Sequence, residues 1–196
     1  MEVAPEPDTV PYQEASFAIP DDIRESMELR DVNRNELADW AAQVVEVEGP
    51  VHVQEIARRL SLLWGYTSTG PAIKAAVAAA AEWALHKNLI RYSDSTSKEF
   101  FDRMDSPDNS LPRDRSSSSA QVRQLRMLPP TEVQAAVIIC VEKNIAIDAH
   151  KCAVQVAKML GYGRASKGFQ TLVQAQVQTL VREGKLQEVG GELKLP

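Results

Sequence analysis

A row of polar side chains near the C-terminus has the types and the spacing for nucleic-acid contact. The row recurs at every fourth position and comprises Gln170, Gln174, Gln178 and Arg182. That spacing places its members on one face of a helix. A glutamine amide can read adenine, and basic side chains, here also Arg164 and Lys167 just before the row, can bind phosphate or guanine. The alternative is an ordinary solvated helix face, because glutamine is a good helix former.

Further basic residues can add nonspecific phosphate contacts. They are Arg58, Arg59, Lys74, Arg113, Arg115, Arg123 and Arg126. Lys74 is expected near the start of a helix whose next residues, 75–81, are almost all alanine. Alanine touches little on a base edge except a thymine methyl group, so close helix packing explains this stretch better. For the arginines there is a simpler interpretation. Arg58 and Arg59 would be a solvated surface pair, and the other four would belong to a soluble linker.

The reactive side chains do not form a catalytic or metal-binding pattern. The histidines are spread along the chain: His52, His86 and His150. Cys140 and Cys152 flank His150 without the paired short intervals of a zinc module, and their apolar surroundings predict two core thiols. The string Gly161-Tyr162-Gly163 follows an expected helix rather than a strand, which is the wrong context for a dinucleotide-binding turn. We therefore expect no catalytic residue, no metal and no cofactor.

The composition is that of an ordinary globular protein. The chain has 196 residues, 44% hydrophobic and 25% charged, which fits one domain or two small ones. A net charge of −5 argues against a strongly basic nucleic-acid binder. No signal-peptide pattern opens the chain, and the longest apolar stretches, 75–81 and 135–141, are far shorter than the roughly 20 residues of a membrane span. We expect a cytoplasmic protein without membrane contact.

Charge and composition divide the chain into four segments. Residues 1–33 hold nine acids against two bases, and residues 34–104 and 129–196 are near neutral. Residues 105–128 are rich in Ser, Pro, Asp and Arg. This stretch cannot bury enough apolar surface to offset the cost of ordering it, so we expect a flexible linker between two folded units.

The acidic first segment also contains apolar anchors. They are Tyr12, Phe17, Ile19 and Ile23. Such a segment can lie against a basic face of its own protein or of a partner.

The two folded units resemble each other in sequence. A shift of 96 residues lays residues 36–91 over residues 132–187 without a gap, and eight of the 56 pairs are identical, Gly65 with Gly161 among them. Many apolar positions coincide as well. The pattern predicts an internal duplication. The alternative is that two unrelated small helical units share such a pattern.

Each unit is expected to contain a helix, a short strand, a helix, a turn, a helix and a two-stranded hairpin. In the first unit the elements are expected at residues 36–47, 51–53, 54–64, 71–87, 89–93 and 98–101. In the second unit, caps included, they are expected at residues 130–143, 145–147, 148–161, 166–184, 185–189 and 192–195. This order predicts a mainly α fold with short β-hairpins, made of two tandem winged-helix units that each contain a helix-turn-helix.

Capping and turn residues mark the ends of these elements. The expected N-caps are Asn35, Thr131, Asp148 and Ser166. Gly65 is expected to stop a helix, because glycine adopts the left-handed conformation of a helix end at no steric cost. The pair Gly190-Gly191 suits the positive φ angles of a primed hairpin turn.

Several strings in the first unit resemble a known module. They are Val44-Val45-Glu46-Val47-Glu48-Gly49-Pro50-Val51-His52, Glu55-Ile56-Ala57-Arg58-Arg59-Leu60 and Trp64-Gly65, with Tyr12-x-x-Ala15 upstream and Gly70-x-x-Ile73 downstream. In these strings the chain is similar to a domain of unknown function found near the C-terminus of large bacterial superfamily-1 DNA helicase-like proteins, often with a nuclease domain. The resemblance covers residues 10–92, and the second unit, with Gly161-Tyr162 and Arg164, fits it more loosely.

The resemblance implies a noncatalytic accessory role in DNA processing, in restriction or in defence against foreign DNA. It implies as partners DNA and the helicase or nuclease domains of the same parent chain, whose motor would be an ATP-dependent helicase. The alanine-rich third helix of the first unit departs from what a DNA-reading helix needs. One alternative is a protein-interaction or structural module that packs through its alanines, and another is a free-standing winged-helix transcription regulator. The alanines in question are Ala75, Ala76, Ala79 and Ala80.

Overall fold

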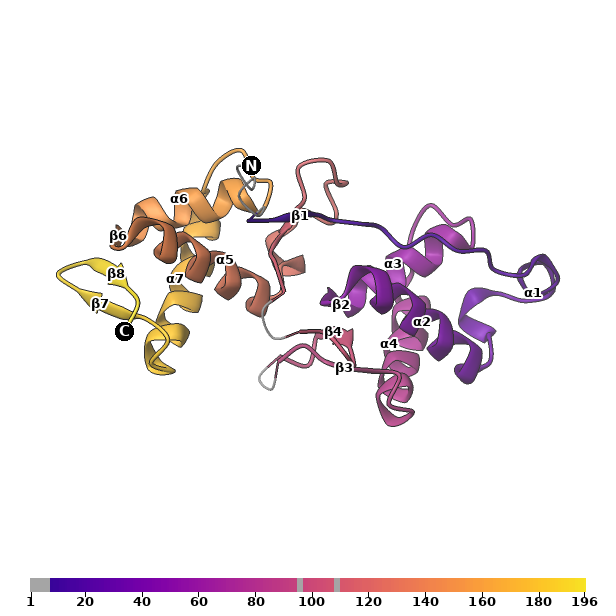
Figure 1. The fold of residues 1–196 in the computed structure, drawn as a ribbon. Coiled ribbons are helices and arrows are strands. Elements are labelled where there is room, and N and C mark those ends of the chain that lie inside the picture. Colours follow the sequence, from indigo (N-terminus) through magenta and orange to yellow (C-terminus); the bar gives the residue numbers. More distant parts are fainter. Residues whose placement is uncertain (1–7, 95–96, 108–109) are drawn as a thin grey trace, which may run out of the picture. The chain divides into compact units, whose positions relative to one another are not determined.

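The computed structural model describes residues 8–94, 97–107 and 110–196 (Figure 1). The remaining residues, which belong to the predicted acidic segment, first hairpin turn and linker, lie outside the described residues. The chain divides into two compact units. The first unit is Gln13–Ser106, and the second combines Pro107–Pro196 with the N-terminal residues up to Tyr12. The fold is mixed α/β, about 52% helical with small sheets.

The first unit is built on the helices α2, α3 and α4 and a three-stranded antiparallel sheet. Its elements in chain order are α1 (Asp21–Ser26), the 3-10 turn η1 (Leu29–Asp31), α2 (Arg34–Glu48), β2 (Val51–His52), α3 (Val53–Leu63), α4 (Pro71–His86), β3 (Ile90–Tyr92) and β4 (Phe100–Arg103). In the sheet, β4 lies between β2 and β3, with Val51 opposite Phe101.

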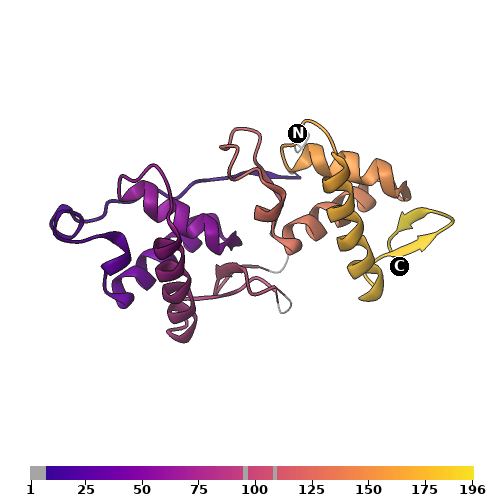
Figure 2. The ribbon, with the colours of Figure 1, turned by 180° about the vertical axis from the view of Figure 1, so that it is seen from behind.

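The second unit has the same core elements (Figure 2). Its elements in chain order are β1 (Val10–Pro11), β5 (Arg113–Asp114), the 3-10 turn η2 (Leu125–Met127), α5 (Pro130–Asn144), β6 (Ile147–Asp148), α6 (Ala149–Met159), α7 (Lys167–Arg182), β7 (Gln187–Val189) and β8 (Glu192–Lys194). In its antiparallel sheet β8 lies between β6 and β7, and β1 pairs in parallel with β5.

The two units repeat each other element by element. The pairs α2 and α5, β2 and β6, α3 and α6, and α4 and α7 begin and end 96 residues apart. Local signals repeat too. His52 and Asp148 cap α3 and α6 by accepting a hydrogen bond from the amide two residues on, and Gly65 and Gly161 follow these helices with φ angles of +93° and +83°. The offset predicted from the sequence therefore holds for the bounds of the helices.

Some predicted details are wrong. Asn33 rather than Asn35 caps α2, because the Asn35 amide donates to the Asn33 side chain at 2.8 Å. Helix α5 has no side-chain cap, so Thr131 does not fill that role. Strand β6 starts two residues later than expected, because Ile145 has a φ of +59°, which no strand allows.

Helix α4 packs against α2 through small side chains. Ala80, Ala81 and Ala84 are fully buried in the first core, and small side chains let two helix axes approach closely. Ala75 and Ala79 are exposed. The alanines predicted as one packing face therefore divide between the core and the surface, with Ala80 in the core.

The core of the second unit is formed by the inward stripes of α5, α6 and α7. It contains Val133, Val137, Val156, Phe169, Val173, Val177 and Leu180. Cys140 and Cys152 are buried in the same core as free thiols. The expected core position of the two cysteines is thus confirmed.

The acidic N-terminal segment packs on the folded units through its apolar side chains. Tyr12, in the second unit, and Ile19, in the first, are buried. Phe17 and Ile23 pack partly buried against the first core, which is apolar rather than the basic face that was expected. Leu29 is buried completely, and the sequence reasoning missed it. None of the helices in the described part of the chain is both long and apolar enough to cross a membrane.

Two arginines of the predicted linker are built into the second unit. Arg113 and Arg115 are buried and bind the Glu132 carboxylate at the start of α5. Arg115 donates from Nη1 to Oε1 at 2.6 Å and from Nη2 to Oε2 at 2.7 Å, and Arg113 Nη2 donates to Oε2 at 2.8 Å. The guanidinium carbon of Arg115 also lies 4.8 Å from the ring centre of Tyr12, and that of Arg113 lies 5.0 Å from it. The expectation that these arginines are solvated is therefore wrong, because a carboxylate compensates their burial.

The same arginines set the ionisation of Glu132. Burial alone would raise its pKa, but the charges and hydrogen bonds of Arg113 and Arg115 outweigh burial and lower the pKa to about 2. A carboxyl group with a lowered pKa in the folded state stabilises folding above its unfolded pKa. That contribution is lost as the pH falls through the folded value.

An alanine at Gly161 should destabilise the protein far more than an alanine at Gly65. Both positions have a left-handed backbone, so each substitution costs about 1 kcal/mol in strain. A Cβ at Gly161 would also lie 2.3 Å from the Ser116 amide nitrogen, whereas a Cβ at Gly65 would meet nothing within 4 Å. We expect Gly161→Ala to cost at least about 2 kcal/mol more than Gly65→Ala in urea unfolding. Equal losses would contradict the close approach of residues 114–116 to Gly161 at the end of α6.

Replacing Glu132 by Gln should lower the free energy of unfolding by about 3 kcal/mol, because two buried arginines lose their carboxylate. Glu36, the residue 96 positions earlier, is exposed. Glu36→Gln is therefore the matched control, with an expected change within about 0.5 kcal/mol. As the pH falls from the ordinary carboxyl pKa of 4.5 to the pKa of about 2 in the folded protein, the wild type should lose this stability, whereas the Glu132→Gln variant should not. Chemical unfolding across this pH range measures both, and equal pH profiles would refute the ion pair.

Candidate nucleic-acid interface

A groove on the second unit gathers most of the predicted polar row. It has a volume of about 710 Å³ and lies between the first turn of α6 and the outer face of α7. Its lining residues are Asp148, Ala149, His150, Ala153, Lys167, Gln170, Thr171, Gln174, Ala175 and Gln178. We call it the α6–α7 groove. The sequence placed the row on one helix face, and the structure adds α6 as the opposite wall.

The amphipathic pattern of α7 turns these side chains outward. Phe169, Val173 and Val177 are buried at intervals of four. Gln170, Gln174 and Gln178 each follow one of them by a single residue, a turn of about 100° around the helix. Ser166 starts the helix by accepting a hydrogen bond from the Phe169 amide, as predicted. The inward stripe therefore fixes where the glutamines point.

The hydrogen bonds of the groove leave part of its polar surface open. Gln170 Nε2 donates to the Ala165 carbonyl oxygen at 2.9 Å, which holds that side chain in place. For the amides of Gln174 and Gln178 no partner is found within the described ranges. On the opposite wall, Asp148 Oδ1 accepts from the amides of His150 and Lys151 and so satisfies the start of α6. The amides of Gln174 and Gln178 are therefore open to a ligand, and the exposed His150 on α6 lines the same groove.

The two arginines of the predicted set lie outside this lining. Arg164 is exposed in the turn before α7. Arg182 is the last residue of α7, is exposed, and donates to Thr179 Oγ1 at 3.0 Å. Inside the groove, Lys167 and Asp148 carry opposite charges. The groove is therefore polar and close to neutral, with Arg164 and Arg182 available as additional cations along the same helix.

The corresponding helix of the first unit has a different outer face. Lys74 is exposed near the start of α4, at the position of Gln170. The counterparts of Gln174 and Gln178 are Ala78 and Glu82. Glu82 accepts a hydrogen bond from the Tyr92 hydroxyl at 2.7 Å. This face therefore offers one lysine and no amide row.

Arg59 cannot serve as the predicted phosphate contact in this conformation, because it is buried among carboxylates. Its Nε donates to Glu48 Oε1 at 2.6 Å and its Nη2 donates to Glu55 Oε1 at 3.2 Å, while Nη1 binds Glu14. Burial opposes the charge of Arg59, but the hydrogen bond and the charge of Glu48 outweigh it, and the pKa of Arg59 is raised. Arg59 thus has a structural role, and that expectation is corrected.

Arg58 is partly exposed and also bound to a carboxylate. Its Nε donates to Glu55 Oε2 at 2.8 Å. Burial raises the pKa of Glu55, and the hydrogen bond and charge of Arg58 offset only part of this. A phosphate would have to compete with this ion pair, so Arg58 is a weaker candidate than Lys167.

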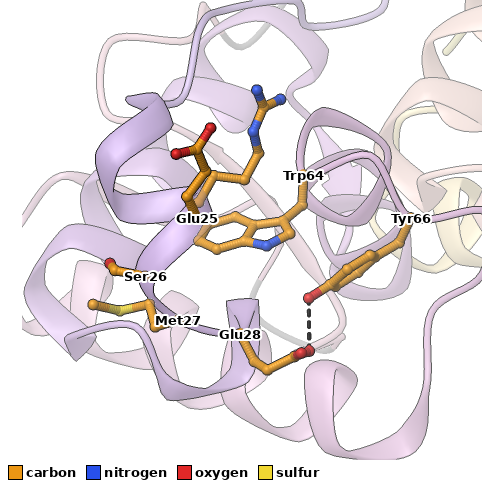
Figure 3. A pocket seen from close by; sticks show the side chains of 7 residues that line it. Glu25, Ser26, Met27, Glu28, Trp64 and Tyr66 are labelled. Atoms are coloured by element: carbon orange, nitrogen blue, oxygen red, sulfur yellow. Dashed lines mark hydrogen bonds between the residues drawn. The ribbon is translucent and has the colours of Figure 1, made fainter.

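A second hollow, of about 500 Å³, lies on the first unit where the acidic segment passes the end of α3 (Figure 3). Its lining includes Arg24, Glu25 and Met27 on one side and Trp64 and Tyr66 on the other. The Tyr66 hydroxyl donates to the Glu28 carboxylate at 2.8 Å, and Figure 3 shows this bond at the edge of the hollow. Trp64 is buried against Trp40, with ring centres 5.9 Å apart. These contacts hold the N-terminal segment on the first core.

The described residues contain no group of three or more His, Cys, Asp or Glu side chains that could hold a metal ion. Cys140 and Cys152 lie in the core, whereas His150 is exposed at the groove. The structure therefore does not bring these three residues together as a ligand set.

A family model described as "Protein of unknown function (DUF3320)" matches residues 28–75. The match runs from the residue before η1 through α2, β2 and α3 into the start of α4. No curated protein and no solved structure matches the chain. The sequence thus carries, over residues 28–75 of its first unit, a domain of unknown function.

Proposed function

We propose that this chain is a noncatalytic module that engages duplex DNA for a helicase- or nuclease-type DNA-processing protein. In this proposal each unit is a winged helix, and the second unit makes the contact through α7. The observation that carries the proposal is the α6–α7 groove, where Lys167, Gln170 and Gln174 line one wall. The helicase or nuclease partner is inferred from the resemblance of the first unit alone.

The order of elements supports the winged-helix assignment. Each unit runs from a helix through a two-residue strand, two further helices and a hairpin, and the short strand pairs with the second hairpin strand. In such an architecture the third helix enters the major groove of DNA while basic side chains fix the register on the phosphates. In the second unit that helix is α7.

The hairpin of the second unit is poorly suited to bind phosphate. Its exposed side chains include Glu188, Val189 and Glu192. Carboxylates repel the phosphate backbone, whose charge dominates affinity for DNA. We therefore assign the phosphate contacts to Arg164, Lys167 and Arg182, which lie on and beside α7.

Removing these three charges should weaken binding to duplex DNA and flatten its salt dependence. We expect the Arg164→Ala/Lys167→Ala/Arg182→Ala variant to lower the slope of log affinity against log salt by up to about 3, since each lost phosphate contact removes about 0.9. A fluorescence titration against duplex and single-stranded DNA, at low and moderate salt, measures the change.

The matched control removes the same number of charges from the second unit, away from the groove. Lys143, Lys185 and Lys194 are paired with Asp8, Glu183 and Glu192 in ion pairs. Their triple alanine variant should keep most of the affinity. The proposal fails if the wild type does not bind duplex DNA, or if both triple variants lose affinity equally.

A second candidate function is protein interaction without nucleic-acid contact. The observation that favours it is the outer face of α4, where Ala72, Ala75 and Ala79 are exposed at spacings of three and four. A row of small side chains lets another helix approach closely. The partner in this case would be another domain of a parent protein or another copy of the chain.

Placing an arginine at Ala79 tests this second function. Because Ala79 is exposed, Ala79→Arg should leave the thermal unfolding midpoint of the chain unchanged. If the alanine face mediates assembly, sedimentation should show a lower mass for the variant than for the wild type. Equal masses, with DNA binding also unchanged, would exclude this face as a contact surface between copies of the chain.

A further inference from the structure

We propose that the α6–α7 groove prefers duplexes rich in A·T pairs, and that Gln174 and Gln178 read adenine there while Ala175 meets the thymine methyl group. This inference rests on the proposed function, because it names the sequence class that the same site would take. It adds a selectivity that phosphate contacts alone cannot give, since these carry no sequence information.

The chemistry of the two open amides matches adenine. A glutamine can bind adenine with two hydrogen bonds, in which its Nε2 donates to N7 and its Oε1 accepts from the N6 amino group. Gln178 is exposed and Gln174 half-buried in the groove. Within the part of the chain that the structure describes, neither amide has a hydrogen-bond partner that would compete.

The other glutamines of α7 show what an occupied amide looks like. Gln176 accepts a hydrogen bond from Gln134 Nε2 on α5 at 2.8 Å and so belongs to the packing of the two helices. Gln170 is held by the Ala165 carbonyl oxygen. Of the four glutamines of α7, Gln170 and Gln176 therefore have intramolecular partners. Gln174 and Gln178 line the groove, and neither has a partner among the described residues.

Small apolar side chains beside the amides complete the match to an A·T pair. Ala175 on α7 and Ala149 and Ala153 on α6 line the same groove. An alanine methyl group is an apolar contact for the thymine methyl, which lies in the major groove on the partner strand of adenine. Asp148 is the one charged acceptor among the lining residues, and its Oδ1 is engaged by the amides at the start of α6.

The spacing of the two glutamines predicts which adenines they reach. Four residues along a helix correspond to about 6 Å. Two base steps along one DNA strand correspond to about 7 Å. A duplex of alternating A and T carries an adenine at every second position of each strand, so it presents adenines at the required interval in every second register.

The first unit supplies the residues for a matched variant. At the positions of Gln174 and Gln178 it has Ala78 and Glu82. The double substitution Gln174→Ala/Gln178→Glu therefore gives α7 the residues that α4 tolerates at the same helix positions. Both sites lie on the surface of the groove, and thermal unfolding of the full chain checks that the variant is folded.

The experiment measures the affinity of the full chain for an alternating A·T duplex and an alternating G·C duplex of equal length at one salt concentration. We expect the wild type to bind the A·T duplex more tightly, by about tenfold for each glutamine that makes its paired hydrogen bonds. The double variant should lose the preference for A·T, and its added carboxylate should weaken binding to both duplexes without removing a phosphate contact.

Base analogues separate the reading of base edges from the reading of DNA shape. Replacing adenine by 7-deazaadenine removes the N7 acceptor, and replacing thymine by uracil removes the methyl group. Each replacement should weaken binding of the wild type, and 7-deazaadenine should leave the double variant unaffected.

The outcomes distinguish this inference from the function on which it rests. If the wild type binds both duplexes equally, or if 7-deazaadenine has no effect, adenine reading is wrong while DNA binding stands. If the preference for A·T persists in the double variant, the selectivity comes from elsewhere and the inference is also wrong. If neither duplex is bound, the proposed function fails together with it.

Discussion

Each unit can close its small core only if its third helix turns one continuous apolar stripe inward. In the second unit that stripe runs through Phe169, Val173, Val177 and Leu180, all fully buried. Because a helix has 3.6 residues per turn, the outer face is fixed once the inner face is packed. The glutamine row and the groove beside α6 are consequences of this single constraint. In the first unit the same constraint is met by Val77, Ala80, Ala81 and Ala84, and its outer face carries alanines instead.

Buried ion pairs hold the segments around these cores. Glu132 in the second unit binds two arginines from the stretch before α5, and Arg59 in the first unit binds Glu14, Glu48 and Glu55. Breaking a buried pair is costly because it leaves an uncompensated charge, although the pair as a whole adds little net stability. These pairs therefore specify how the N-terminal segment and the 113–116 stretch lie on their units. They also withdraw Arg59, Arg113 and Arg115 from the set of cations that could meet DNA.

The helices were predictable because their signals are local. Apolar spacing located α2, α3 and α4 within about two residues, and the caps Asp148 and Ser166 and the turn at Gly190-Gly191 were identified from residue type alone. The polar row on α7 followed from the same periodicity. The opposite wall of the groove, on α6, could not be predicted in this way. The start of α6 faces the side of α7 through a tertiary contact, which periodicity along one helix does not reveal.

The buried charges could not be foreseen for a related reason. Arg113 and Arg115 stand in a stretch whose composition is typical of a solvated linker, and Glu132 resembles its exposed counterpart Glu36. Their burial depends on Tyr12, a residue about one hundred positions away in sequence. Sequence patterns of period two or 3.6 carry no information about such pairings.

Whether α7 contacts DNA can be seen by NMR, from the side-chain amide signals of the glutamines while duplex DNA is added to the full chain. We expect the amides of Gln174 and Gln178 to shift or broaden, while that of Gln176, held by Gln134, does not. Signals of α4 should stay unchanged at the same DNA concentration. Perturbations confined to α4 or to the β7–β8 hairpin, with the α7 amides unaffected, would show that α7 does not contact DNA.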